Sequence, residues 1–149
     1  MEIKGLTKVF ATPTGKLKVF DRLNLTLAEP EITVILGPSG CGKTTLLNIL
    51  AGFLQHDGGR ITRRPKRVSY LFQEPRLLPW RTVEKNILLV LEGHITDQSQ
   101  RTAAAGRYLD LVGLGEFSQH YPHELSGGMR QRSAMARAFA SPSQMLLMD

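Results

Sequence analysis

The chain has 149 residues, of which 42% are hydrophobic and 21% are charged, and its formal net charge is +6. This length and composition fit one soluble globular core, and no apolar run approaches the ~20 residues that a membrane-spanning helix needs. The first ten residues lack the basic and then apolar pattern of a secretory signal, so we expect the protein to start and stay in the cytoplasm.

The positive charge is scattered along the chain, apart from one group that follows a pair of glycines. The members of this group are Arg60, Arg63, Arg64, Lys66 and Arg67. We interpret the group as a solvated turn between two elements, so no nucleic acid is expected as a partner. The single cysteine, Cys41, excludes an intramolecular disulfide and fits a reducing compartment.

The first half of the chain predicts three strands and a helix. The runs Glu2–Phe10 and Lys16–Leu27 alternate like strands and are separated by a turn that contains proline and glycine. The β-branched run Ile32–Leu36 is typical of a parallel strand that is buried on both faces. After a glycine-rich loop, Lys43–Ala51 predicts a helix that is closed by Gly52.

The second half predicts two further strands and three helices. Strands are expected at Arg67–Phe72 and at Met145–Met148. Thr82–Leu91 and Arg101–Leu114 show the 3.6-residue period of amphipathic helices, and residues 126–140 predict a third helix with a serine cap. Strands that alternate with helices indicate an α/β fold around a parallel sheet.

Residues 37–44 match the phosphate-binding loop pattern G-x-x-x-x-G-K-[ST] without a mismatch. The glycines allow a tight turn whose N–H groups point at phosphate oxygens, and the following helix directs its positive end at the same anion. Lys43 supplies charge for the β and γ phosphates, and the Thr44 hydroxyl can join a Mg²⁺ shell. We therefore expect a nucleoside triphosphate to bind at Gly37, Pro38, Ser39, Gly40, Cys41, Gly42, Lys43, Thr44 and Thr45.

Residues Leu125–Arg132 resemble the signature segment of ABC-type ATPases, with Met129 where that family usually has glutamine. Ser126, Gly127 and Gly128 at a helix N-terminus make a second anion site. The resemblance implies that this site faces the γ-phosphate held by the other subunit of a dimer. An ordinary serine cap with a flexible approach is the alternative interpretation.

Three more positions follow the family's order of motifs. Gln73 resembles the glutamine that reaches Mg²⁺ and the attacking water, and Asp149 ends an apolar run that resembles the Walker B strand, whose aspartate helps to hold Mg²⁺. Phe10 resembles the aromatic residue that stacks on adenine, although a strand phenylalanine is more often part of a core. The resemblance thus implies catalytic roles for Lys43, Gln73 and Asp149, and a metal site formed by Thr44, Gln73 and Asp149.

The resemblance covers essentially residues 1–149 and implies one ABC-type ATP-binding domain. Its fold would be a P-loop α/β core with an N-terminal antiparallel β portion and a helical subdomain inserted near residues 74–130. We expect this domain to be incomplete, truncated at the Walker B strand, because the family's catalytic glutamate and later histidine lie beyond that aspartate. The chain alone should therefore bind ATP weakly and hydrolyse it at a negligible rate. Its own histidines, expected at the surface or as caps, are His56, His94, His120 and His123.

The segment Leu71–Trp80 is most similar to that of importers of nitrate, sulfonate and taurine. The resemblance implies a subunit that uses ATP and Mg²⁺, forms a homodimer around two nucleotides, and drives a transmembrane permease through contacts around Gln73–Trp80. It would lie peripherally on the cytoplasmic face of the inner (cell) membrane and depend indirectly on a periplasmic or extracellular solute-binding protein. Two alternatives remain: a truncated remnant without turnover, and a soluble ABC-type ATPase that acts on nucleic acid.

Overall fold

The computed structural model describes residues 1–149 as two compact units, and each unit is described by itself below. The first unit contains Met1–Lys66 together with Asp149, and the second contains Arg67–Met148. None of the helices has the length and apolar character needed to cross a membrane.

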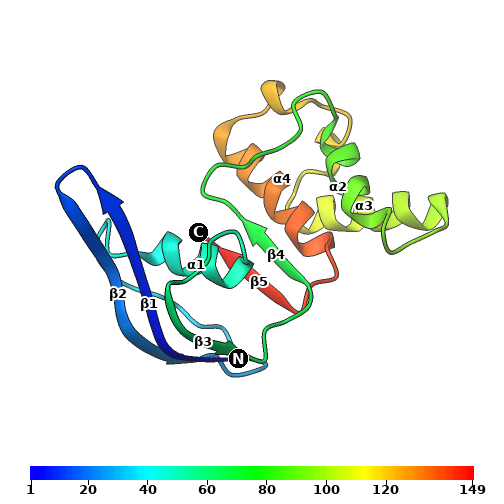
Figure 1. Ribbon diagram of the computed structural model, residues 1–149. Helices are drawn as coiled ribbons and strands as arrows, with labels where there is room; N and C mark the ends of the chain where they lie inside the picture. Colours follow the sequence, from blue (N-terminus) through cyan, green and yellow to red (C-terminus); the bar gives the residue numbers. More distant parts are fainter. The chain divides into compact units, whose positions relative to one another are not determined.

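The first unit consists of a three-stranded antiparallel sheet and one helix (Figure 1). Strand β1 (Glu2–Thr12) lies between β2 (Gly15–Thr26) and β3 (Gly58–Thr62), and β1 and β2 form the predicted hairpin. Helix α1 (Lys43–Ala51) is also confirmed. It ends because Gly52 adopts the left-handed conformation, with φ of 82°.

Two sequence predictions for this unit are wrong. Residues 58–62, interpreted as part of a turn, form β3 and pair with β1; the glycines at its start gave a turn signal that tertiary pairing overrides. The run Ile32–Leu36 joins no sheet, and the side chains of Ile32 and Leu36 are 96% and 87% exposed. A strand needs a hydrogen-bonded neighbour, and this run has none in the structure, so its β-branched composition does not make it a strand.

The second unit contains a two-stranded parallel sheet and a helical portion. Strand β4 (Val68–Leu71) pairs with β5 (Met145–Met148), and Val68 lies opposite Met145. Parallel strands require a long crossover connection. Here the connection carries α2 (Val83–Leu91), α3 (Gln98–Leu111), the 3₁₀ turns Gly115–Phe117 and Pro122–Glu124, and α4 (Gly127–Ala140).

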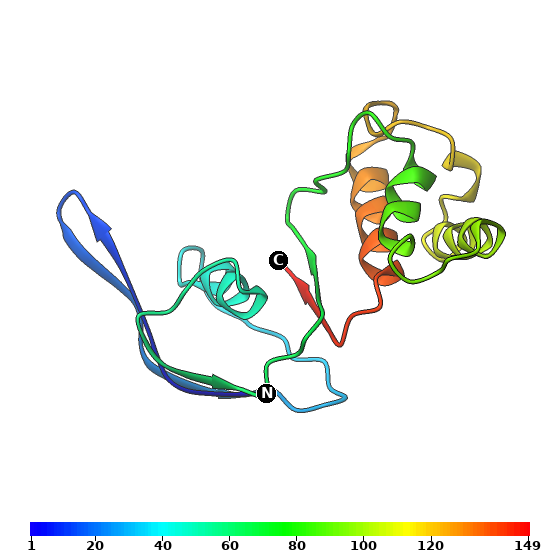
Figure 2. The same ribbon diagram turned by 45° about the vertical axis from the view of Figure 1, so that its right-hand side comes forward.

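Helices α2, α3 and α4 enclose one apolar core, which includes the fully buried Ile87 and Ala136. In Figures 1 and 2, α2 and α4 run side by side and α3 lies across them. Each helix begins at a residue whose side chain accepts a backbone hydrogen bond: Thr82, Asp97 and Ser126. Helix α3 therefore starts earlier than predicted, because Asp97 rather than a residue near position 101 provides its cap.

Asp57 connects the segment before β3 to β1. Its carboxylate accepts hydrogen bonds from the Val9 N–H at 2.7 Å and from the Lys8 ammonium at 3.2 Å. The Val9 N–H, followed by the Lys8 ammonium, lowers the pKa of the Asp57 carboxyl from its ordinary value. The ionised carboxylate therefore stabilises the sheet.

We expect Asp57→Asn to lower stability at neutral pH and to weaken its acid dependence. Because the folded-state pKa lies below the unfolded one, the contribution is complete above the unfolded pKa and is lost as the pH falls through the folded one. Thermal unfolding midpoints of the variant and the parent should therefore converge below about pH 4. Asp21→Asn is the matched control, since the Asp21 carboxylate contacts the exposed side chains of Lys18 and Arg22. Equal pH effects in the two variants would contradict this role for Asp57.

Candidate nucleotide-binding site

The loop before α1 has a backbone suited to an anion. Gly40 and Gly42 have φ values of 79° and 101°, in the left-handed region that favours glycine. Gly42 is the N-cap residue of α1 and offers no side-chain acceptor to the first turn. The first-turn N–H groups are thus left for an external acceptor, and the helix dipole favours a negative charge there.

Gly42 lies close to the hairpin. A Cβ at this position would lie 2.6 Å from Val19 Cγ1 and 3.1 Å from Phe20 Cζ, so no larger residue fits. The sequence did not predict that these two β2 residues approach the loop, since strand alternation does not say which element a strand packs against. Phe10, the predicted adenine-stacking residue, is half-buried, and the Lys8 ammonium lies 5.1 Å from its ring centroid. Its role stays a prediction.

The Lys43 ammonium folds back onto the loop that precedes it. Nζ donates hydrogen bonds to the carbonyl oxygens of Gly37 and Pro38, both at 2.8 Å. These charge-assisted bonds keep the cation within the glycine-rich segment. A phosphate at this loop would compete with the two carbonyls as the acceptor.

Thr44 and Asp149 meet although 105 positions separate them in the sequence. The Thr44 hydroxyl donates a hydrogen bond to Asp149 Oδ1 at 2.8 Å. Mg²⁺ prefers oxygen ligands, and proteins commonly hold it with one or two side chains together with phosphate oxygens of the substrate. This hydroxyl and carboxylate, next to a loop suited to phosphate, therefore fit a Mg²⁺ site.

The remaining predicted residues belong to the second unit. Gln73 is exposed and follows β4 by two residues. At the start of α4, Ser126 Oγ accepts a hydrogen bond from the Met129 N–H at 3.3 Å. Gly128 is exposed, and a Cβ there would meet no atom within 4 Å. The N-terminus of α4 is therefore open to an approaching anion.

Two polar residues that hold the loop after Gln73 were not predicted. Asn86 is fully buried in α2, and its side chain accepts from the Leu78 N–H at 2.8 Å and donates to three backbone carbonyls of the loop and helix start. Arg137 of α4 donates to two further loop carbonyls. Asn86 could have been found in the sequence, because an amide side chain on the apolar face of a predicted helix indicates a buried group that needs hydrogen-bond partners. Arg137 gave none, because its partners are backbone atoms.

The histidines follow the expectation with one exception. His94 and His123 are exposed, and His56 Nδ1 lies 3.1 Å from the Gly58 carbonyl oxygen. His120 differs, because its Nδ1 is buried and has no hydrogen-bond partner. Its ring packs at 5.3 Å from that of Phe117, which explains why it is drawn inward.

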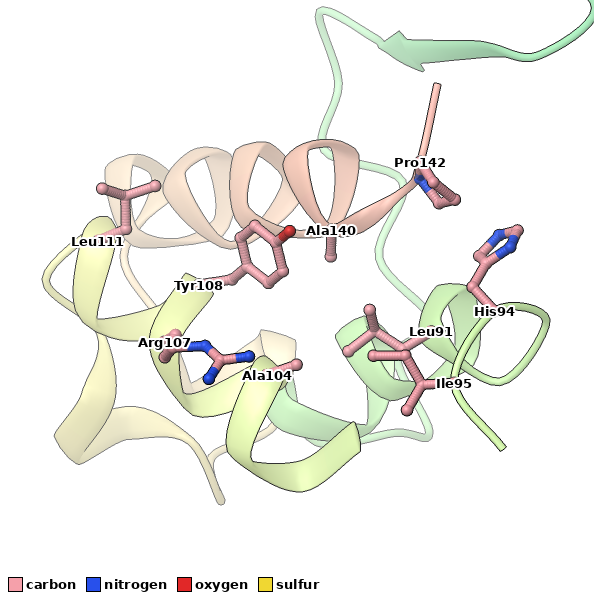
Figure 3. A pocket seen from close by; sticks show the side chains of 9 residues that line it. All are labelled: Leu91, His94, Ile95, Ala104, Arg107, Tyr108, Leu111, Ala140 and Pro142. Atoms are coloured by element: carbon pink, nitrogen blue, oxygen red, sulfur yellow. The ribbon is translucent and has the colours of Figure 1, made fainter. Parts of the chain in front are cut away.

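Two hollows in the second unit are lined by none of the predicted nucleotide-binding or metal-binding residues. One, of about 460 Å³, lies where the ends of α2 and α4 meet α3 (Figure 3). Its lining side chains are Leu91, His94, Ile95, Ala104, Arg107, Tyr108, Leu111, Ala140 and Pro142. The other, of about 480 Å³, lies beside Trp80, which is 71% exposed.

Comparison with known protein families and sequences gives matches over the whole of this chain. A family model described as "ABC transporter" matches residues 20–149. The uncharacterized ABC transporter ATP-binding protein MJ0412 of Methanocaldococcus jannaschii is 39% identical, over 100% of this chain and 58% of its own length. The aliphatic sulfonates import ATP-binding protein SsuB of Bacillus cereus is 38% identical, over 100% of this chain and 61% of its own length.

A solved structure is similar as well. The ATP-binding cassette MJ0796, in a dimeric post-hydrolysis state bound to ADP and Pi, matches with a TM-score of 0.89 and 28% identity. The match covers 99% of this chain and 72% of that one. The chain thus spans about three fifths of the length of the curated relatives named above, at 58% and 61%.

We expect Gly42→Ala to weaken nucleotide binding at least tenfold, a loss on the order of 1.4 kcal/mol. The new Cβ would clash with Val19 and Phe20 and would strain a backbone with φ of 101°. The measurement is a fluorescence titration with a labelled ATP analogue. Gly106→Ala is the matched control, because a Cβ at this position of α3 would meet no atom within 4 Å and alanine favours a helix. Equal affinities for Gly42→Ala and the parent would show that the loop is not the binding site.

Proposed function

This chain belongs to the ABC transporter family, and we propose on that basis that it is the nucleotide-binding part of a subunit that hydrolyses ATP to drive solute import. The observation that carries the proposal is the contact between Thr44 and Asp149. It places a carboxylate beside the loop hydroxyl at the open N-terminus of α1, where a nucleotide's phosphates need both positive charge and a metal.

The ATP site would use loop backbone and few side chains. Residues 37–45 would bind the phosphates through N–H groups, and Lys43 would exchange its carbonyl acceptors for phosphate oxygens. Phe10 would stack on the adenine ring. The close fit of Gly42 against the hairpin supports a preformed loop, which loses little entropy on binding.

The hydrolytic site would add a metal and a positioned water. Bound Mg²⁺ would offset charge that develops on the phosphate oxygens. Thr44 and Asp149 would hold the metal, and Gln73 would orient the attacking water and contact the metal. The distance of 2.8 Å between the Thr44 hydroxyl oxygen and Asp149 Oδ1 supports the assignment of these two residues to the metal. The exposure of Gln73 leaves its amide free for the second.

The complete enzyme would be a head-to-tail homodimer. Ser126, Gly127 and Gly128 of one subunit would face the γ-phosphate held by the other. The open N-terminus of α4 and the free space at Gly128 support this role. The MJ0796 cassette, whose structure is similar, forms a dimer.

The importer assignment depends on the likeness to SsuB and on the loop after Gln73. We propose that the subunit acts on a permease for a sulfonate-like or related small solute, at the cytoplasmic face of the cell membrane. A solute-binding protein would be an indirect partner. The exposed Trp80 beside a hollow of about 480 Å³ offers an apolar contact for the permease. Residues 74–130 would act as the helical subdomain that carries this surface.

In the whole protein we expect Lys43→Ala and Asp149→Asn each to lower ATP turnover by about a hundredfold or more. Lys43→Ala removes the positive charge proposed to bind the phosphates, and Asp149→Asn removes the carboxylate charge proposed to bind the metal. The rate of phosphate release measures the turnover. Lys4→Ala, which removes an exposed lysine of β1, is the matched control. Full turnover in either site variant would refute the proposed function.

The 149-residue chain by itself should release phosphate from ATP at a background rate only. Hydrolysis requires an oriented water and charge stabilisation together, and the family resemblance assigns part of this work to a glutamate and a histidine that follow the Walker B aspartate. The assay compares the purified chain with its Lys43→Ala variant. Turnover that the variant abolishes would contradict this prediction.

A further inference from the structure

Arg137 is a half-buried cation that forms no ion pair with a carboxylate. On α4, its Nη1 donates to the Arg76 carbonyl oxygen at 3.0 Å and its Nη2 donates to the Pro75 carbonyl oxygen at 3.1 Å. Burial lowers the pKa of the guanidinium. A buried charge is costly unless it is well hydrogen-bonded, and here two neutral backbone groups serve that purpose. The two hydrogen bonds in turn fix the position of those carbonyls relative to α4.

The two carbonyls belong to the residues two and three positions after Gln73. Arg76 adopts the left-handed conformation, with φ of 44°, which non-glycine residues rarely adopt. Its guanidinium lies 3.9 Å from the ring centroid of Phe72, which stacks on Tyr70 of β4 at 4.3 Å. Gln73 is therefore held between a stacked ring on one side and the Arg137 contacts on the other.

The far end of the same loop has a separate anchor. Asn86 bonds to both the N–H and the carbonyl of Leu78, at 2.8 and 3.2 Å, and to the carbonyls of Arg81 and Thr82. These contacts connect the loop around Trp80 to α2. The loop thus has two anchors on two helices, and the segment next to Gln73 is the one that depends on α4.

We propose that Arg137 is a positioning residue that couples Gln73 to the N-terminus of α4. The helix is continuous from Gly127 to Ala140, so Arg137 lies about 15 Å along the same rigid element from the Ser126–Gly128 segment. A displacement of that segment moves the Arg137 guanidinium, and the bidentate contact moves the backbone beside Gln73. The inference rests on the proposed function, which gives both Gln73 and Ser126–Gly128 a role at the nucleotide.

The anchor is tested by a spin label next to Gln73. Glu74→Cys in a Cys41→Ser background places a nitroxide on the exposed neighbour of Gln73. Arg137→Met keeps a long apolar side chain but cannot donate a hydrogen bond to the two carbonyls. The label should then move more freely, and the lines of its EPR spectrum should become sharper. Arg137→Lys, a single ammonium for two carbonyls, should give an intermediate spectrum.

The fluorescence anisotropy of Trp80, the only tryptophan, is the internal control for the end of the loop that Asn86 holds. The Trp80 anisotropy should be equal in the labelled parent, in Arg137→Met and in Arg137→Lys. Identical label spectra would overturn the anchor. A joint change of label, Trp80 anisotropy and unfolding temperature would reveal general destabilisation and would overturn it as well.

Coupling is tested in the whole protein by steady-state ATP hydrolysis. Arg137→Met should lower kcat about tenfold while the KM for ATP stays within about twofold, and Arg137→Lys should recover part of the loss. An unchanged kcat, or a loss confined to KM, would overturn the coupling. If the parent itself hydrolyses no ATP, the proposed function and the coupling fail, whereas the spin-label result still decides whether Arg137 anchors the loop.

Discussion

The hydrogen bond from the Thr44 hydroxyl to Asp149 joins two segments that the chain brings together only by folding. One segment is a glycine loop at a helix start, and the other is the residue after an apolar strand. Separately, a glycine loop can bind any anion, and an aspartate at the end of a strand does not by itself indicate a metal site. Side by side they combine N–H donors, an ammonium and two oxygen atoms of the kind that Mg²⁺ prefers, which is a combination that would suit a nucleoside triphosphate with its Mg²⁺.

Backbone groups do much of the positioning in both units. In the first unit, the Lys43 ammonium is held by carbonyls of its own loop, and the lack of a Cβ at Gly42 lets the hairpin come close. In the second, Asn86 and Arg137 reach backbone atoms of the loop that begins at Gln73. Side chains that bind backbone fix a segment's position without depending on which residues it contains.

The elements with local signals could be predicted from the sequence. Helix α1 with its closing Gly52, and α4 with its Ser126 cap, follow from short-range chemistry and have the expected ends. The run 32–36 and strand β3 could not be predicted, because a strand exists only with a partner and the partner is set by tertiary structure. Motifs in the sequence singled out the loop residues and Asp149 as candidates, whereas Arg137 was missed since a backbone partner leaves no trace in the sequence.

The contact of Arg137 with two carbonyls has a consequence for how such subunits diversify. Because the guanidinium of Arg137 binds main-chain carbonyls, exchange of the side chains at positions 74, 75 and 77 leaves both of its acceptors in place, provided that the left-handed turn at Arg76 is kept. In the proposed function, the surface that would meet a permease and the contact that would transmit motion are therefore formed by different residues. On that proposal, substitutions in the loop would change the surface offered to a partner and leave the contact with α4 in place.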